Sequence, residues 1–86
     1  MQFVTLIKFR RRPTKAEVES TPNRVEAAGV KVLSSFWCLG RYDAVVISEA
    51  PNVEIAMKGF SSILDYASSE TMAAIPRADA VKLAGY

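Results

Sequence analysis

The sequence has 86 residues, of which 50% are hydrophobic and 23% are charged, as is typical of one small folded domain. A chain of this size buries only about 60–65% of its unfolded surface, so association with a second copy is a natural way to enlarge the core. The net charge of +2 is too small to indicate a polyanionic partner by itself. Histidine is absent, which argues against haem-dependent and zinc-dependent mechanisms; we expect no cofactor and no metal.

The chain begins with signals for a strand and a helix. Residues 2–9 are rich in β-branched and aromatic side chains and predict a first strand. Thr14 and Glu17 fit a capping box, which indicates a short turn of helix. A threonine–proline pair then fits the start of a second helical segment over 22–28, and Gly29 fits a C-terminal glycine cap. We therefore expect a first helix that is divided at the proline.

Two strand-like segments follow and are joined by a short turn. Residues 30–39 and 43–50 both carry strand-forming side chains, and Gly40 can adopt an unusual backbone angle between them. A tight β-hairpin is the simplest connection. Cys38 falls in the first of these strands, where we expect a small core residue rather than a reactive thiol.

The second half of the chain predicts a helix, a strand and a short terminal helix. Asn52 fits an N-cap, after which apolar residues recur at spacings of three and four: Val53, Ala56, Met57, Phe60, Ile63, Leu64 and Ala67. This pattern is typical of an amphipathic helix. Residues 69–75 predict a fourth strand that Pro76 closes. Residues 78–84 fit a terminal helix capped by Gly85.

The element order predicts an α+β fold in a single domain over residues 1–86. Strand, helix, strand, strand, helix, strand is the order of the ferredoxin-like βαββαβ fold, with two helices on one face of a four-stranded antiparallel sheet. Alternation makes both faces apolar: Val4 and Leu6 point opposite to Phe3 and Ile7. Because two helices cover only one face, we expect a face-to-face homodimer, in the dimeric α+β barrel arrangement, or a larger oligomer.

Several other partners and locations are excluded or disfavoured by the sequence. We expect a cytoplasmic protein, because no signal peptide precedes the first strand and the single cysteine cannot form an internal disulfide. No apolar run approaches the ~20 residues that span a bilayer, so we expect no membrane partner. Nucleic acid is disfavoured because residues 44–50 lack stacking aromatics. We interpret the basic cluster as a solvated loop or a contact with an acidic ligand: Lys8, Arg10, Arg11, Arg12 and Lys15.

The hairpin carries a family resemblance. Residues 40–46 read Gly-Arg-Tyr-Asp-Ala-Val-Val, which resembles the GYD domain family, named for its glycine, tyrosine and aspartate. The segment 21–28 and the pair Glu70-Thr71 are also similar to the family pattern, so the resemblance covers nearly the whole chain. It implies a ferredoxin-like fold related to dimeric α+β barrels, without an established substrate. The predicted first helix is about two turns shorter than the resemblance to this family implies.

A similar hairpin occurs in the ligand-binding domain of Lrp/AsnC-type regulators. There, the neighbourhood of the turn forms an amino-acid effector site between subunits. By analogy of fold, this resemblance implies a stand-alone small-molecule-binding module whose site lies near the hairpin or at the subunit interface. The candidate ligand-binding residues are Lys8, Trp37, Arg41, Tyr42, Asp43 and Glu49.

Each candidate residue has a structural interpretation beside the functional one. Tyr42 can donate to a ligand and Asp43 accept from it, or Asp43 can accept backbone N–H groups while Tyr42 packs over the turn. Arg41 can hold a ligand carboxylate or remain solvated. We expect Lys8, Glu49 and Glu70 to meet near strand ends, as ion pairs or as a site with a raised carboxylate pKa. Trp37 and Phe36 point to opposite faces and line either a pocket or an interface.

The alternative function is a cofactor-independent enzyme of the dimeric-barrel kind. Such an isomerase, cyclase or monooxygenase would act on a small enolisable or aromatic compound, with Tyr42, Asp43 or Glu49 as acid or base. The sequence assigns no catalytic residue. A buried, unpaired carboxylate would favour the enzyme, whereas an Asp43 bonded to backbone amides would favour the binding module.

Overall fold

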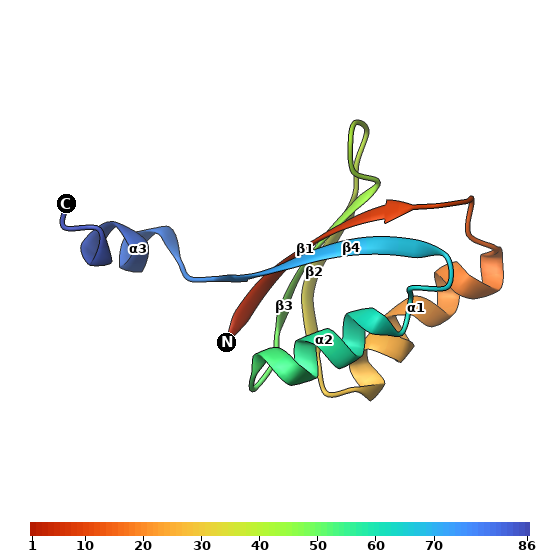
Figure 1. The fold of residues 1–86 in the computed structure, drawn as a ribbon, viewed down its shortest axis with the longest axis horizontal. Helices are drawn as coiled ribbons and strands as arrows, with labels where there is room; N and C mark the ends of the chain where they lie inside the picture. The colour runs from red at the N-terminus through yellow and green to blue at the C-terminus, as the bar shows by residue number, and fades with distance from the viewer.

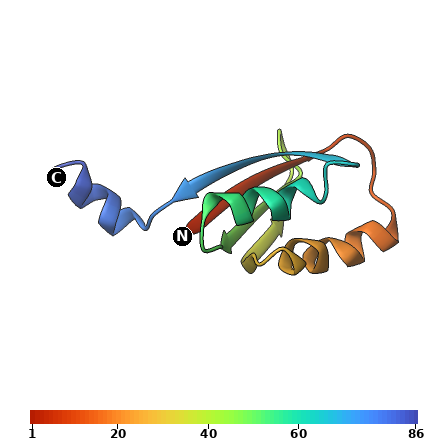
Figure 2. The same cartoon turned by 60° about the horizontal axis from the view of Figure 1, so that its bottom comes forward.

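The computed structural model describes all of residues 1–86 and has an α+β fold with one sheet and three helices. In chain order the elements are β1 (Gln2–Phe9), α1 (Lys15–Ala27), β2 (Lys31–Trp37), β3 (Ala44–Glu49), α2 (Val53–Ser61), β4 (Ala67–Ala74) and α3 (Arg77–Leu83). The four strands pair antiparallel in the order β2-β3-β1-β4. α1 and α2 lie on one face of this sheet, and α3 extends away from it (Figures 1 and 2). None of the helices has the length and apolar character needed to cross a membrane.

β1 organises the sheet because it pairs with both β3 and β4. Its register places Val4 directly between Ile47 and Met72. The strand alternates as predicted: Phe3, Thr5 and Ile7 are buried beneath the helices, and Val4 and Leu6 point to the opposite face. We call that opposite, helix-free surface the open face of the sheet.

The hydrophobic core lies between the sheet and the two packed helices. It consists of 12 buried residues: Phe3, Ile7, Val25, Val30, Ala44, Val46, Ala50, Ala56, Phe60, Ile63, Tyr66 and Ala67. α1 contributes only Val25 to this set, whereas α2 contributes Ala56, Gly59 and Phe60 to the buried surface. α1 therefore covers its side of the sheet thinly, and β2 beneath it has no fully buried residue.

α1 is one continuous helix, so the predicted division at Pro22 is wrong. The capping box is present as predicted, with the Glu17 N–H donating to the Thr14 hydroxyl at 3.2 Å. Thr21 is inside the helix and donates its hydroxyl proton to the Glu17 carbonyl at 2.6 Å, instead of capping a new segment. The proline removes one backbone hydrogen bond without ending the helix. Because α1 begins at Lys15, it has 13 residues and is longer than the predicted segment 22–28.

α2 is shorter than its apolar pattern predicted. Its N-cap is as expected, because the Asn52 side chain accepts the Ile55 N–H at 2.9 Å. The helix ends at Ser61, and the chain then turns into β4. Ile63 and Ala67 continue the apolar spacing although they lie in the turn and in the strand, which is why the pattern over-extended the helix.

The β2–β3 hairpin projects beyond the sheet (Figure 1). The Cys38 N–H donates to the Asp43 carbonyl at 2.8 Å and closes the loop, in which Gly40 has φ +135°. Only glycine adopts such an angle readily, so the predicted role of Gly40 is confirmed. The prediction for Cys38 is wrong, because this residue follows β2 in the loop and is exposed rather than a core residue.

α3 matches the predicted terminal helix but packs against little of its own chain. None of its residues is buried, and Leu83 remains 80% exposed. The Cα radius of gyration is 13.7 Å, against about 12 Å for a compact chain of this length. An isolated helix this short is unstable in water. α3 therefore has little packing with its own chain to stabilise it.

The start of α1 gives stability a pH dependence. Arg11 donates to both carboxylate oxygens of Glu17 at 2.7 and 2.8 Å, and with the Thr14 N–H this lowers the pKa of Glu17 from 4.5 to about 2. Since the folded-state pKa is the lower one, the stabilisation is present above about pH 4.5 and is lost as the pH falls through 2. We expect Glu17→Gln to lower the melting temperature at pH 7, and the difference from wild type to shrink between pH 4.5 and 2.

Thermal unfolding followed by circular dichroism measures this difference. Glu19→Gln is the control, because Glu19 lies in the same helix and makes a single long ion pair of 3.9 Å with an exposed lysine. A Glu17→Gln deficit that stays constant from neutral to acidic pH would contradict the assignment.

Gly59 permits the close approach of α2 to its neighbours. A Cβ at this position would lie 2.7 Å from Val30 Cγ2 and 3.3 Å from the Val25 carbonyl. Alanine normally favours a helix by about 0.5–1 kcal/mol over glycine, but overpacking costs about 1–3 kcal/mol. We expect Gly59→Ala to lower the free energy of unfolding in urea by about 1–2 kcal/mol. Ser61→Ala in the same helix is the control, and a more stable Gly59→Ala would show that this approach is not tight.

Candidate functional site

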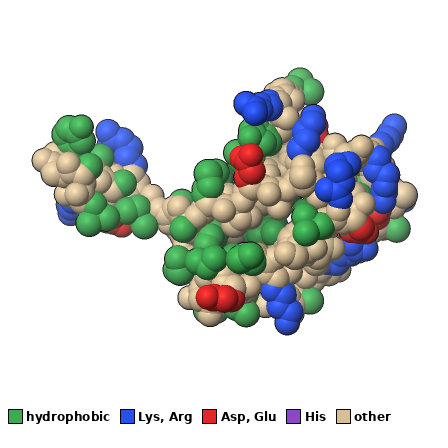
Figure 3. All heavy atoms as spheres, in the orientation of Figure 1, with side chains coloured by type: hydrophobic (Ala, Val, Ile, Leu, Met, Phe, Trp, Pro, Cys, Tyr) green, Lys and Arg blue, Asp and Glu red, His purple; other side chains and the backbone are tan.

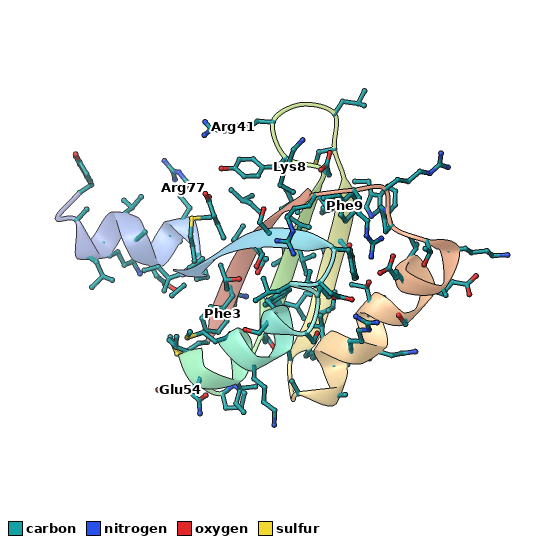
Figure 4. All side chains as sticks on the ribbon, turned by 45° about the vertical axis from the view of Figure 1, so that its right-hand side comes forward. Phe3, Lys8, Phe9, Arg41, Glu54 and Arg77 are labelled. Atoms are coloured by element: carbon teal, nitrogen blue, oxygen red, sulfur yellow. The ribbon has the colours of Figure 1, made fainter.

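Three of the predicted site residues meet at one end of the open face, beside the hairpin. They are Lys8 at the end of β1 and Tyr42 and Asp43 in the hairpin, and Glu70 of β4 joins them. Figure 4 shows Lys8 near the base of the hairpin and Arg41 on its projecting loop. The antiparallel pairing of β1 with β3 and β4 brings these distant parts of the sequence together.

Asp43 ties the hairpin to β1. Its N–H donates to the Ile7 carbonyl at 2.8 Å, and its Oδ2 accepts the Phe9 N–H at 2.8 Å. The same oxygen lies 3.6 Å from Lys8 Nζ. The carboxylate is therefore bonded to the backbone, as the structural interpretation of Asp43 predicted.

Tyr42 reaches across the sheet to β4 instead of packing over its own turn. Its hydroxyl donates to Glu70 Oε2 at 3.1 Å. The Arg41 guanidinium lies 5.8 Å from the centre of the Tyr42 ring, within the range of a cation–π contact. Arg41 is therefore placed by the aromatic ring and makes no ion pair.

A polar hollow of about 280 Å³ lies between these side chains, and we call it the hairpin hollow. It is lined by Leu6, Lys8, Tyr42, Ser68, Ser69 and Glu70. An ammonium group, a carboxylate and hydroxyl groups therefore surround one small space, which suits a small polar molecule with both donors and acceptors. Sequence reasoning placed Glu70 near a strand end but did not include it in the site, because the register of β4 on β1 is not visible in the sequence.

Glu49 does not reach the hairpin hollow, so the expectation that Lys8, Glu49 and Glu70 meet is wrong for Glu49. It pairs with Gln2, at the opposite end of β1 from Lys8, because β3 runs antiparallel to β1. Lys8 pairs with Ser68, two residues from Glu70 on the same face of β4. Of the predicted charge group, only Lys8 and Glu70 lie close together.

Trp37 lies on the helical face of the sheet, away from the hairpin hollow. It pairs with Ala44, which is buried beneath the helices, and its ring contacts Phe9 edge-on at 5.5 Å. Phe36 pairs with Val45 and points to the open face. The two aromatic residues therefore point to opposite faces, as predicted.

The chemistry available at the hairpin hollow is hydrogen bonding and charge attraction. Among polar residues, only Thr5 and Ser48 are buried, so every carboxylate of the chain is at least partly exposed. No group of three or more potential metal ligands is present among histidine, cysteine, aspartate and glutamate. The arrangement can bind and orient a ligand, and it holds no carboxylate of the buried, unpaired kind expected of an acid–base enzyme.

Stability measurements separate the roles of Asp43 and Tyr42. Asp43→Ala leaves the Phe9 N–H without its acceptor, and we expect a loss of about 1–3 kcal/mol in the free energy of unfolding. Tyr42→Phe loses one exposed hydrogen bond, and we expect a change below about 0.5 kcal/mol. Urea unfolding measures both variants. An Asp43→Ala variant as stable as Tyr42→Phe would refute the structural role of the carboxylate.

Comparison with known proteins identifies the family of the chain. The chain matches the family model of the GYD domain over residues 5–84. The match includes the hairpin, both packed helices and α3. A search of curated proteins finds no significant match. Because the family match covers nearly the whole chain, the protein belongs to the GYD domain family.

Proposed function

We propose that the protein is a ferredoxin-like module that self-associates through its open face and binds a small polar molecule at the hairpin hollow. The observation that carries this proposal is the apolar character of the open face, which no segment of the chain covers. The strand order β2-β3-β1-β4, with two helices on one face, supports the fold assignment. In a face-to-face pair the hairpin hollow lies at the rim of the interface.

The apolar residues of the open face form continuous rows across the strands. Leu6 pairs with Val45, which pairs with Phe36, and Val4 lies between its neighbours on β3 and β4. The members of the patch are Val4, Leu6, Phe36, Val45, Ile47 and Met72. Phe36 is 59% exposed and Met72 is 46% exposed. A contiguous apolar patch of this kind is typical of an interaction surface, and a second copy offers the matching apolar surface.

α3 gives independent support for a second copy. It stands apart from the sheet, and hydrophobic side chains are exposed both on the helix and on the part of the body beside its connection (Figure 3). Leu83 and Tyr86 are almost fully exposed. In an oligomer, the neighbouring copy supplies the surface that this short helix needs.

The bonding of Asp43 favours a binding module over an enzyme. Its carboxylate is occupied by the Phe9 N–H and by Lys8, so it is not free to act as a general base. The alternative, a cofactor-independent isomerase, cyclase or monooxygenase, has less support because it requires a carboxylate held in a dry cavity. The hydrogen-bonding groups of Lys8, Tyr42 and Glu70 are suited to a ligand with an amino and a carboxylate group.

Light scattering tests the association. We expect the wild-type chain to have at least twice the 9.4 kDa monomer mass at micromolar concentration. Val45→Glu places a charge in the centre of the patch and is expected to give a monomer. Met57→Glu is the matched control, because Met57 is an exposed apolar residue of α2 outside the open face. A monodisperse wild-type monomer would refute the proposed interface.

A ligand screen by native mass spectrometry tests the hairpin hollow. With amino acids and small carboxylates as the panel, Tyr42→Phe and Glu70→Gln are each expected to weaken binding about fivefold to tenfold, the value of one hydrogen bond. Glu54→Gln is the control, because Glu54 is an exposed residue on α2, far from Lys8 and Arg41 (Figure 4). If the two variants bind the same ligand as tightly as wild type, the hairpin hollow is not the site.

A further inference from the structure

A cavity of about 100 Å³ lies on the helical face of the sheet, between α1 and the β2–β3 edge. Its floor includes Ile7, Ala44 and Val46, and Thr21 and Pro22 of α1 form its roof. A narrower space of about 60 Å³ continues from it beneath α1 and shares several of these residues. The cavity is present because α1 buries so little of its surface. The small side chain of Ala44 also leaves space unfilled above the sheet.

The cavity opens to solvent beside two aromatic residues. Trp37 and Phe9 line both the inner cavity and a wider outer cleft of about 530 Å³. The Trp37 side chain is part of this mouth, and the residue is 65% exposed. Phe9 lies on the side of the molecule where α1 begins (Figure 4). An exposed tryptophan at the entrance of an apolar cavity is suited to contact with a ligand.

The outer cleft is positively charged. Arg12 and Lys15 line it, and no acidic residue does. Arg12 forms no ion pair, and Lys15 has only one long, exposed contact of 3.9 Å with a glutamate. The neighbouring Arg11 is already bonded to Glu17 and is not available. Two cations at the entrance therefore favour a ligand with a negative group.

The inner cavity is suited to an apolar group. Its lining contains no charged residue. Thr21 donates its hydroxyl proton to the Glu17 carbonyl, so in the contact between Thr21 and Tyr66 the phenol is the donor. Both protons are therefore used within the wall, and neither hydroxyl can donate to a ligand. Aromatic and aliphatic side chains form most of the remaining surface.

We propose that this cavity binds a small carboxylate whose apolar part is about the size of a phenyl ring. The apolar part enters the inner cavity of about 100 Å³ and the adjoining space of about 60 Å³ beneath α1. Apolar cavities of about 150 Å³ in other proteins hold benzene. The carboxylate lies in the outer cleft, within reach of Arg12 and Lys15. The site lies on the opposite face of the sheet from the hairpin hollow and needs no second copy, so it does not rest on the proposed function.

Fluorescence of the full chain tests the site, because Trp37 is its only tryptophan. We expect phenylacetate to change the Trp37 emission saturably, and the neutral phenylacetamide to bind about fivefold more weakly, as loss of an exposed ion pair predicts. We expect no saturable response to phenethylammonium. Equal binding of the three probes, or no saturation by millimolar phenylacetate, would overturn the proposal.

Variants locate the two parts of the ligand. Arg12→Gln and Lys15→Gln are each expected to weaken phenylacetate binding about threefold to fivefold. Lys31→Gln is the control, because Lys31 lies at the opposite end of β2 from Trp37. Unchanged binding in both Arg12→Gln and Lys15→Gln would contradict the role of the cleft.

Filling the cavity provides the second test. Ala44→Val adds two methyl groups to the floor and is expected to weaken phenylacetate binding at least tenfold, without lowering the melting temperature. Ser35→Leu fills the same cavity from the exposed strand β2 and replaces this variant if Ala44→Val does not fold. A folded filling variant that binds phenylacetate as wild type does would overturn the proposal.

Discussion

The rest of the structure depends on a single constraint: the sheet has two apolar faces and the chain has only two helices that pack on it. β1 shows this most directly, because Phe3 and Ile7 enter the core while Val4 and Leu6 point to the open face. Burial of apolar surface is the main favourable contribution to folding, and a chain of this length has little of it. The open face therefore leaves a large apolar surface in contact with water, and burying it would stabilise the fold. Association with a second copy is the simplest way to bury it.

The hairpin connects this constraint to the candidate site. Asp43 holds the turn against β1 through its backbone and its carboxylate, and Gly40 supplies the angle that the turn requires. Tyr42 then points across the sheet, and its hydroxyl donates to Glu70. The three residues that name the family thus have different tasks. Glycine and aspartate build the hairpin, and tyrosine is the member whose polar group remains at the hollow.

The sequence predicted the local features of the fold well and its long-range contacts poorly. The first strand, the N-caps at Thr14 and Asn52 and the positive φ of Gly40 follow from local preferences, and these agree with the structure. The division at Pro22 was wrong because the helix begins at the capping box of Thr14 and continues through the proline despite one lost hydrogen bond. The positions of Glu49 and Glu70 depend on strand register, which no local pattern specifies. The inner cavity depends on volume that α1 leaves unfilled, and the sequence does not show that volume either.

Isotope-filtered nuclear Overhauser spectroscopy on a mixture of ¹³C-labelled and unlabelled chains tests the central claim most directly. If two copies meet at the open face, the labelled methyl groups of Val4, Leu6 and Val45 will show contacts with Phe36 or Met72 of an unlabelled chain. Methyl groups of the core, such as those of Ile63, will show none. Intermolecular contacts that are absent from the open face, or that arise only at α2, would contradict the claim.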